Sequence, residues 1–260
     1  MTMRKTFSTL IAVLLCVSGT ASAGEWYFGG SLGFGMQDDS DNSGALTSAF
    51  TTGNGLPAIP NGTVLPAGTT VGWTTDFDDD MAVSLEAGMR YDSGLRSGVE
   101  LSFGSADVET HRGVTVGGTV IDGVDAAVLT GSATQLGATV GQVVADGRGD
   151  ISTVTLFFNA YYDFNRDSNF EPYIGVGLGF SDVDVSFNPS GVGIVDDGET
   201  VLAYQVKLGA TLQFNENWEG FADYAHRMTE DVEVGVGLFP ATLEIENEQG
   251  LFSVGARYRF

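Results

Sequence analysis

The chain ends with the stretch FSVGARYRF, residues 252–260, in which apolar and polar residues alternate strictly. Every second position is apolar, namely Phe252, Val254, Ala256, Tyr258 and Phe260. The positions between them hold Ser253, Gly255, Arg257 and Arg259. Strict alternation is typical of a β-strand with two unlike faces. The rest of the sequence decides which solvent the apolar face meets.

Seven earlier segments alternate in the same way, at residues 26–36, 81–91, 96–104, 153–163, 172–181, 202–212 and 218–228. The connections after the second, fourth and sixth segments are short, with the sequences DSGL, NRDSN and NEN. The other connections are longer, and the first two run to about 40 residues, a length that is uncommon in compact soluble domains. Short turns on one side and long loops on the other are typical of an up-and-down outer-membrane β-barrel.

Aromatic residues gather where such a barrel would meet the membrane boundary. They flank the three short turns and mark the chain ends, as Tyr91, Phe164, Phe170, Phe214, Trp218, Trp26, Tyr258 and Phe260. Aromatic girdles of this kind lie at the membrane–water interface, whereas a soluble sandwich would bury its aromatics in mid-strand. Each segment has about 10 residues, which is the length that a tilted strand needs to cross the hydrocarbon.

We therefore predict an all-β fold, a closed antiparallel up-and-down transmembrane β-barrel of eight strands. Its apolar parity faces lipid, and its polar, glycine-rich parity lines a narrow lumen. The alternative is ten strands, if a β-favouring loop stretch such as GVTVGGTVI, residues 113–121, enters the wall.

The N-terminus predicts secretion. Arg4 and Lys5 precede an apolar run at residues 7–17, and an A-x-A cleavage site follows at residues 21–23. We expect residues 1–23 to be a signal peptide and residues 24–260 to be the barrel domain. A lipoprotein anchored at Cys16 is the alternative, which Leu15 disfavours because a small residue is needed there. Cys16 is the single cysteine, so no disulfide framework is expected.

The charge of the chain is strongly negative, with 34 acidic and 11 basic residues. Nucleic acid is excluded as a direct partner on this ground. Most of the acidic residues fall in the four long loops, where hard divalent cations such as Ca²⁺ or Mg²⁺ could bind weakly. Solvation and mutual repulsion are the favoured reading of these charges, and we expect no tightly bound cofactor. The candidate metal ligands form one run, Asp76, Asp78, Asp79 and Asp80.

The lumen parity carries charges of both signs, which we expect to form a network: Glu86, Arg90, Arg96, Glu100, Lys207, Asp223, Arg227, Arg257 and Arg259. Charges in a narrow barrel are costly unless they are paired. One reading is a polar plug that holds the barrel shut. The other is a narrow cation-preferring pore, in which Glu86 or Glu100 exchanges partners with Lys207 or Arg257.

Enzyme chemistry is not expected. The sequence has two histidines, His111 in the second long loop and His226 in the seventh segment. A barrel hydrolase needs a histidine beside a nucleophile or carboxylate at its outer rim. Neither histidine stands in a recognisable catalytic motif, so a barrel enzyme acting on lipid or peptide is the third and least favoured reading.

The chain resembles the OmpA/OmpX-like family of small bacterial outer-membrane β-barrels. The closing ARYRF, residues 256–260, is similar to the terminal signal of that family, and FEPYIGVGLGF, residues 170–180, is similar to its fifth strand. The resemblance implies a place in the bacterial outer membrane, with lipid and lipopolysaccharide as neighbours. It also implies that the barrel-assembly machinery reads Tyr258 and Phe260. It does not extend to a peptidoglycan-binding domain.

The expected function follows from these observations. We predict a non-enzymatic outer-membrane barrel that acts through its acidic extracellular loops, in surface interaction or in envelope integrity. The sequence does not name an extracellular ligand.

Overall fold

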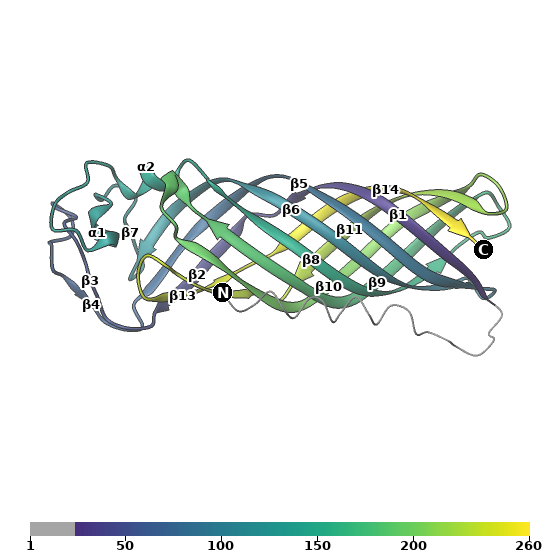
Figure 1. The fold of residues 1–260 in the computed structure, drawn as a ribbon, viewed down its shortest axis with the longest axis horizontal. Coiled ribbons are helices and arrows are strands. Elements are labelled where there is room, and N and C mark those ends of the chain that lie inside the picture. Colours follow the sequence, from purple (N-terminus) through teal and green to yellow (C-terminus); the bar gives the residue numbers. More distant parts are fainter. Residues whose placement is uncertain (1–23) are drawn as a thin grey trace.

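Eight long strands form a closed ring in the computed structural model of the protein, which describes residues 24–260 (Figure 1). In ring order they are β1 (Gly24–Gln37), β5 (Thr70–Tyr91), β6 (Leu95–Val116), β8 (Gly149–Asp163), β9 (Phe170–Phe187), β10 (Val195–Gln213), β11 (Trp218–Thr229) and β14 (Glu248–Arg259). All neighbours are antiparallel, and β14 pairs with β1 to close the ring. The predicted eight-stranded antiparallel barrel is thus confirmed.

The ten-strand alternative is wrong. The stretch at residues 113–121 forms the end of β6 and the short strand β7 (Thr119–Val120), which pairs with β6 outside the ring. Each alternating segment predicted from the sequence lies inside one ring strand, with Phe260 following the last. The strands are longer than the alternation indicates, because β5 and β6 each reach 22 residues.

The connections divide the barrel into two unlike ends. Three short turns and the C-terminus lie at the right-hand end in Figure 1, and the long loops lie at the left-hand end. The right-hand end is therefore periplasmic, and the left-hand end is extracellular. The expected signal peptide, residues 1–23, lies outside the described residues.

The periplasmic half of the barrel exposes its apolar parity. Phe252, Val254, Val176 and Leu178 are each more than half exposed, although all four are apolar and lie mid-strand. In water this surface would be unfavourable, and in a bilayer it meets lipid chains. This half of the barrel is therefore the membrane-spanning half.

The barrel continues above the membrane with the same strand order. β2 (Ser40–Leu46), β13 (Ala241–Ile245) and β12 (Val232–Gly235) follow one another beside β5, as β1, β14 and β11 do below. Because β1 runs into β2, β11 into β12 and β13 into β14, these strands are extensions of the membrane wall. We call this extracellular part the outer half.

Polarity inverts along single strands at the boundary between the halves, and β9 shows it most clearly. Below Ser181 the outward positions are apolar, and glycines face inward. Above it Val183, Val185 and Phe187 turn inward and are fully buried, while Asp182 and Asp184 face outward. The inversion follows from the solvent, since the outer half has water around it and buries its apolar residues inside.

On β5 and β6 the inversion is accompanied by irregular pairing. The register between the two strands shifts at Asp76, Phe77 and Asp80. An extra residue in a strand moves the following side chains to the other face. As a result Trp73 and Thr75 point inward above the shift, at odd positions, and the inward positions below it are even.

Loop segments close the extracellular end. They include α1 (Ala127–Thr130), α2 (Val140–Val144), the turn η3 (Pro189–Gly191) and the hairpin of β3 (Phe50–Thr51) and β4 (Val64–Leu65). Val128, Val140 and Val144 belong to the same apolar core as the inward residues of the outer strands. Within residues 24–260, no helix combines the length and the apolar character that a membrane span requires.

Candidate functional site: a filled lumen and an acidic outer surface

All nine charged residues that the sequence places in the lumen face inward. Neighbouring strands bring them together because polar side chains occupy every second position on each strand. Seven of them form two groups, one towards the periplasmic end and one around Glu100, and the other two, Glu86 and Asp223, are held by tyrosines.

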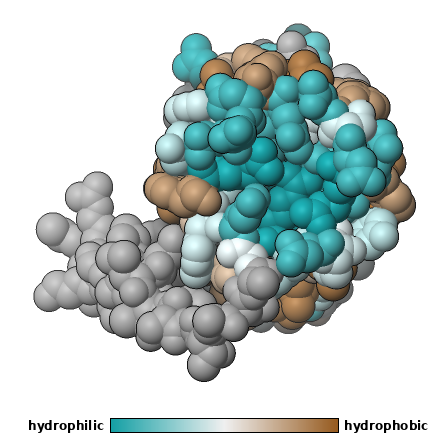
Figure 2. All heavy atoms as spheres, turned by 90° about the vertical axis from the view of Figure 1, so that its right-hand side faces the viewer, coloured by the Kyte–Doolittle hydropathy of each residue, from teal (hydrophilic) through white to brown (hydrophobic). Residues whose placement is uncertain are grey.

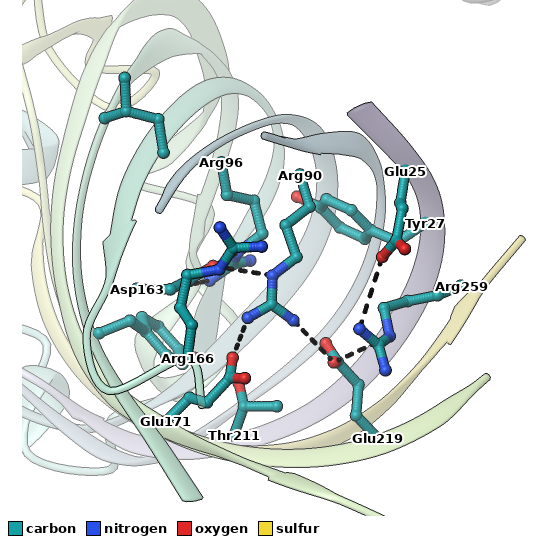
Figure 3. A network of polar contacts seen from close by, with 12 residues as sticks. Glu25, Tyr27, Arg90, Arg96, Asp163, Arg166, Glu171, Thr211, Glu219 and Arg259 are labelled. Atoms are coloured by element: carbon teal, nitrogen blue, oxygen red, sulfur yellow. Dashed lines mark hydrogen bonds and ion pairs between the residues drawn. The ribbon is translucent and has the colours of Figure 1, made fainter. Parts of the chain in front are cut away.

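The periplasmic group centres on Arg90 and Arg96 (Figure 3). Arg90 bonds to Glu171 and lies 3.7 Å from Asp163 and 3.6 Å from Glu219. Arg96 donates to Asp163 at 3.3 Å and stacks over the ring of Tyr161, with 3.9 Å between guanidinium carbon and ring centroid. Each arginine therefore has carboxylate partners, as burial of its charge requires.

Arg257 and Arg259 extend this group along the last strand. Arg257 lies 3.4 Å from Glu219 and 3.8 Å from the centroid of the Phe221 ring. Arg259 reaches the same Glu219 at 3.6 Å and also lies 3.5 Å from Glu25. Glu219 is thus shared by three arginines, and this sharing binds β14, β11 and β5 to one another across the lumen.

Tyrosine hydroxyl groups hold the carboxylates that have no cation directly beside them. Glu86 accepts hydrogen bonds from Tyr27 at 2.5 Å and from Tyr161 at 3.1 Å. Asp223 accepts one from Tyr173 at 2.6 Å. The tyrosine rings need space beside the neighbouring strand. A Cβ at position 175 would lie 2.3 Å from a ring atom of Tyr161, which explains a glycine there.

The second group is built around Glu100. Its carboxylate accepts from Lys207 at 2.7 Å, Arg227 at 2.8 Å, Asn159 at 2.8 Å and Gln205 at 3.1 Å. The four donors come from three strands, β8, β10 and β11, and Glu100 itself lies on a fourth strand, β6. This carboxylate is therefore the polar centre of the upper lumen, the part of the lumen next to the outer half.

The Glu100 group and the apolar core of the outer half leave little space between them. A cavity of about 20 Å³, lined by residues including Thr155, Phe157, Arg227 and Gln249, lies between the Glu100 group and the apolar core. Such a volume holds about one water molecule. From the periplasm outwards, the interior is thus first charged and hydrogen-bonded and then apolar.

Four lumen partners were not singled out as charged sites from the sequence, namely Glu25, Asp163, Glu171 and Glu219. Glu171 and Glu219 stand beside short turns, where strand bounds are least certain. The signal was present, because Glu171 shares its parity with Tyr173 and Glu219 with Asp223. Their parity alone would have identified them as inward-facing.

The run of aspartates proposed as metal ligands is dispersed. Asp76 pairs with Arg112 at 2.6 Å on the outer surface, Asp78 faces outward, and Asp80 faces inward and bonds to Gln249. The side chain of Asp79 lies outside the described part of the structure. Among the described residues, no three His, Cys, Asp or Glu side chains converge as a metal site would require.

The outer half instead carries its acidic residues on its exterior. An open groove of about 750 Å³ runs over β2, β5 and β13. Asp41, Glu233, Glu244 and Glu246 line it, together with Thr70, Thr74 and Thr242. We call this surface the acidic groove. Its carboxylates are exposed, so it presents negative charge to the extracellular medium.

The two histidines lie in unlike places. His111 is buried in the outer half, where its Nδ1 is 2.8 Å from the hydroxyl oxygen of Thr75. Burial lowers the pKa of His111 to about 4, against the opposing effect of Asp146 and Asp76. His226 lies at the wall of the barrel, with Nε2 2.9 Å from Glu248.

Tyr258 and Phe260 lie at the periplasmic end among other aromatics. The ring of Tyr258 packs 5.1 Å from the ring of Trp218 and 5.1 Å from that of Phe260. The Phe260 side chain is 77% exposed. Viewed from this end, the molecule has a hydrophilic centre with hydrophobic patches around its edge (Figure 2). Polar residues thus cover the periplasmic end of the lumen, inside a lipid-facing rim.

Two solved structures of outer-membrane proteins are similar to this chain. OprG from Pseudomonas aeruginosa matches with a TM-score of 0.52 and 16% identity, over 92% of this chain and 96% of that one. Neisserial surface protein A matches with a TM-score of 0.43 and 15% identity, over 90% and 97%. At these identities, the match with OprG shows the fold alone. No curated protein matches the chain.

The sequence profile of the outer membrane protein beta-barrel domain matches residues 7–260, which is nearly the whole chain. This match agrees with the closed ring, the lipid-facing belt and the aromatic rim. The chain therefore belongs to the family of outer membrane protein beta-barrel domains, and its place is the bacterial outer membrane.

Proposed function

We propose that this protein is a non-enzymatic outer-membrane barrel that carries a rigid, acidic extracellular domain, and that this domain acts in surface interaction or envelope integrity. One observation carries the proposal. The outer half buries a continuous apolar core inside extended barrel strands and places its carboxylates outside. The long loops are thereby built into a folded support for a charged surface.

The core of the outer half supports a fixed shape. Leu243, Ile245, Val232 and Val234 are fully buried, and they come from the hairpin of the last long loop. Burying an aliphatic side chain stabilises a fold by about 1.5–3 kcal/mol. A loop held in this way presents the same groove to every partner, which costs less ordering entropy on binding than a disordered loop would.

The alternative is a narrow cation-preferring pore through the lumen. It rests on the mixed-charge network, in which the Glu100 carboxylate contacts both Lys207 and Arg227 and could exchange one partner for the other. An ion on that path would also have to cross the apolar core above the network. Removing an ion from water into an apolar medium is strongly unfavourable, so the filled outer half favours the first proposal.

Catalysis is also disfavoured by the surroundings of the histidines. The hydroxyl group beside His111 belongs to Thr75, which is fully buried. His226 faces a glutamate. A nucleophile must meet its substrate, and Thr75 has no contact with solvent. Unchanged background hydrolysis of lipid and peptide in His111→Ala and His226→Ala variants is therefore expected.

We further propose the partners that the location implies. Lipid and lipopolysaccharide surround the wall, and the assembly machinery recognises Tyr258 and Phe260, whose rings are at the rim. Any Ca²⁺ or Mg²⁺ would bind weakly at the exposed carboxylates of the outer half, between them and lipopolysaccharide phosphates. No tightly bound cofactor is proposed.

The acidic groove gives the sharpest test. A strain that lacks the protein would receive either the wild type or a variant with Asp41→Asn, Glu233→Gln, Glu244→Gln and Glu246→Gln. The matched control neutralises acids at the periplasmic turns, with Asp92→Asn, Asp167→Asn and Glu216→Gln. Resistance of cells to detergent with chelator would report envelope integrity, and attachment to surfaces would report interaction.

We expect the groove variant to lose the wild-type effect in at least one assay and the control to keep it. Heat-dependent gel mobility would verify that both variants are folded. Full restoration of both phenotypes by a folded groove variant would contradict the proposal.

A further inference from the structure

The first two long loops meet at the extracellular tip of the barrel, in a surface that we call the neutral cap. It comprises residues 47–69 and 126–139, which include β3, β4 and α1, and it lies at the end of the molecule away from the C-terminus (Figure 1). The sequence has no charged residue between Asp41 and Asp76 or between Asp125 and Asp146, although 17% of the chain is charged. The tip is therefore neutral, while the chain as a whole is strongly acidic.

Aliphatic side chains of the neutral cap are exposed. Leu56, Val64 and Leu136 are 50%, 63% and 56% exposed, and Pro57 is exposed beside Leu56. Leu56 and Leu136 belong to different loops, but Gln135 Nε2 donates to the Leu56 carbonyl oxygen at 2.7 Å and so keeps the two side by side. Exposed apolar residues that gather in one place mark an interaction surface.

Hydrogen bonds join the two loops into one unit. The backbone amides of Gly53 and Asn54 donate to the carbonyl groups of Val128 and Ser132, at 3.3 Å and 2.7 Å. The side chain of Asn54 also donates to the carbonyl group of Ala133 at 3.2 Å. The exposed aliphatic side chains are thus held in a fixed arrangement and need little ordering on binding.

Many polar side chains of the neutral cap are paired within it. Five hydroxyl groups donate to carbonyl oxygens of the same loops at 2.7–3.2 Å, namely those of Thr52, Thr63, Thr69, Thr130 and Ser132. A polar group that is already paired loses little when it leaves water, whereas an unpaired one loses its hydrogen bonds. The cap is therefore suited to a medium that offers few hydrogen-bond partners.

We propose that the neutral cap binds the surface of an apposed lipid bilayer that has no net charge, into which Leu56, Val64 and Leu136 insert. A bilayer gives aliphatic side chains an apolar surrounding and penalises charged ones, and the cap exposes aliphatic side chains and has no charged ones. The acidic exterior of the outer half repels an anionic bilayer, so a zwitterionic bilayer is the surface that the domain matches.

Other occupants match the neutral cap less well. Contact with a second copy of this chain, tip to tip, would bring two acidic outer halves towards each other, whereas an uncharged bilayer adds no such repulsion. A protein partner is usually met by direct polar contacts around an apolar centre, and the cap uses many of its donors internally. The cap is also a different surface from the acidic groove, whose carboxylates remain in every variant below.

Residues 24–260 contain no cysteine, so a polarity-sensitive fluorophore can be attached at one chosen site. Ala133→Cys places it on the neutral cap, at an exposed side chain. Ser43→Cys, exposed in the acidic groove, is the matched control. Each labelled barrel would be refolded in lipid nanodiscs and titrated with vesicles of phosphatidylcholine, or of phosphatidylcholine mixed with anionic phosphatidylglycerol.

We expect phosphatidylcholine vesicles to shift the emission of the Ala133 label saturably to the blue and to leave the Ser43 label unchanged. Partition into the anionic vesicles should be weaker. Leu56→Asp with Leu136→Asp should lower partition into phosphatidylcholine about tenfold or more, because carboxylates would have to enter the bilayer. Ser43→Asp with Thr242→Asp adds the same charge in the acidic groove and should leave partition unchanged.

Heat-dependent gel mobility would verify folding of each variant. No blue shift with phosphatidylcholine, an equal shift of both labels, or stronger partition into anionic vesicles would overturn the proposal. A blue shift that grows with protein concentration without vesicles would identify a second copy as the occupant and would overturn it too. The comparison of the two labels needs only one exposed substitution in each protein and so does not depend on the aspartate variants.

Discussion

At the scale of single residues, Glu100 holds the upper lumen together. Its carboxylate is the shared partner of Lys207 and Arg227 inside the lumen, where Glu100 and Lys207 are buried and Arg227 is partly buried. A buried ion pair adds little stability over an apolar pair of the same shape, but removal of one partner leaves an uncompensated charge. The cost of a substitution here therefore lies mainly in what it leaves behind.

Glu100→Gln should lower the free energy of unfolding by about 3–5 kcal/mol, because two cations lose their carboxylate. Urea unfolding of the refolded chain in lipid, followed by gel mobility, would measure it. The double variant Glu100→Gln with Lys207→Met should recover part of the loss. Glu230→Gln, at an exposed site, is the control. A Glu100→Gln barrel as stable as the wild type would show that the network is not paired as described.

His111 supplies a pH dependence of the outer half. Burial depresses its pKa to about 4, below the ordinary value of 6.5. Between these values the unfolded chain binds a proton that the folded chain does not, so stability is full above pH 6.5 and falls as the pH drops to 4. The shift corresponds to about 3 kcal/mol.

Amide exchange of the outer strands at pH 7, 5 and 4 would measure this loss. His111→Phe should remove the part of the dependence between pH 6.5 and 4, while carboxylates elsewhere keep theirs. An identical pH profile in the two proteins would contradict the assigned burial of His111.

At the scale of secondary structure elements, the membrane strands could be predicted and the outer strands could not. Alternation, loop lengths and aromatic positions placed eight strands correctly, because lipid outside and polar groups inside give a period of two. The stretch VDVSF, residues 183–187, alternates too, but with the opposite parity relative to the strand before it. The predicted strand at residues 172–181 therefore ends before this stretch. The apolar residues lie on the inner face here, because this part of the strand is surrounded by water and not by lipid.

The candidate site was predictable to a similar degree. Parity identified which charges face inward, since each position of a strand has one of two faces. Pairing needed the register between strands, which brings Glu100 of β6 to Lys207 of β10 across the lumen. An apolar cavity of about 30 Å³ beside His111 could not be foreseen, because its lining combines strand residues with loop residues such as Leu129 and Leu238, which lie far apart in the sequence.

In the outer half, the side chains of Asp197 and Glu199 on β10 accept hydrogen bonds from the amides of Gly235 and Glu233 on β12, a contact that we call the carboxylate seam. Replacing both acids, in Asp197→Ala with Glu199→Ala, should expose the amides of Glu233 and Gly235 that they now accept from. We expect amide exchange at these two positions to become about tenfold faster, since a net hydrogen bond contributes about 1 kcal/mol or somewhat more. Glu244→Ala, on the neighbouring β13, is the matched control. Unchanged exchange at both positions would show that the seam has another closure.

At the scale of the whole molecule, the barrel is one wall with two kinds of interior. The membrane half is filled by ion pairs and tyrosine hydrogen bonds, and the outer half by an apolar core. Each filling suits the medium around it, because lipid outside requires apolar residues outside and water requires them inside. The consequence is a closed support for the acidic extracellular surface.

Single-channel conductance of the refolded chain, residues 24–260, in a planar bilayer tests this closure most directly. Refolding would first be verified by heat-dependent gel mobility. The two fillings predict a silent barrel at moderate voltage. Reproducible conductance steps with cation preference, altered by Lys207→Met or Glu100→Gln, would contradict a closed lumen and favour the pore.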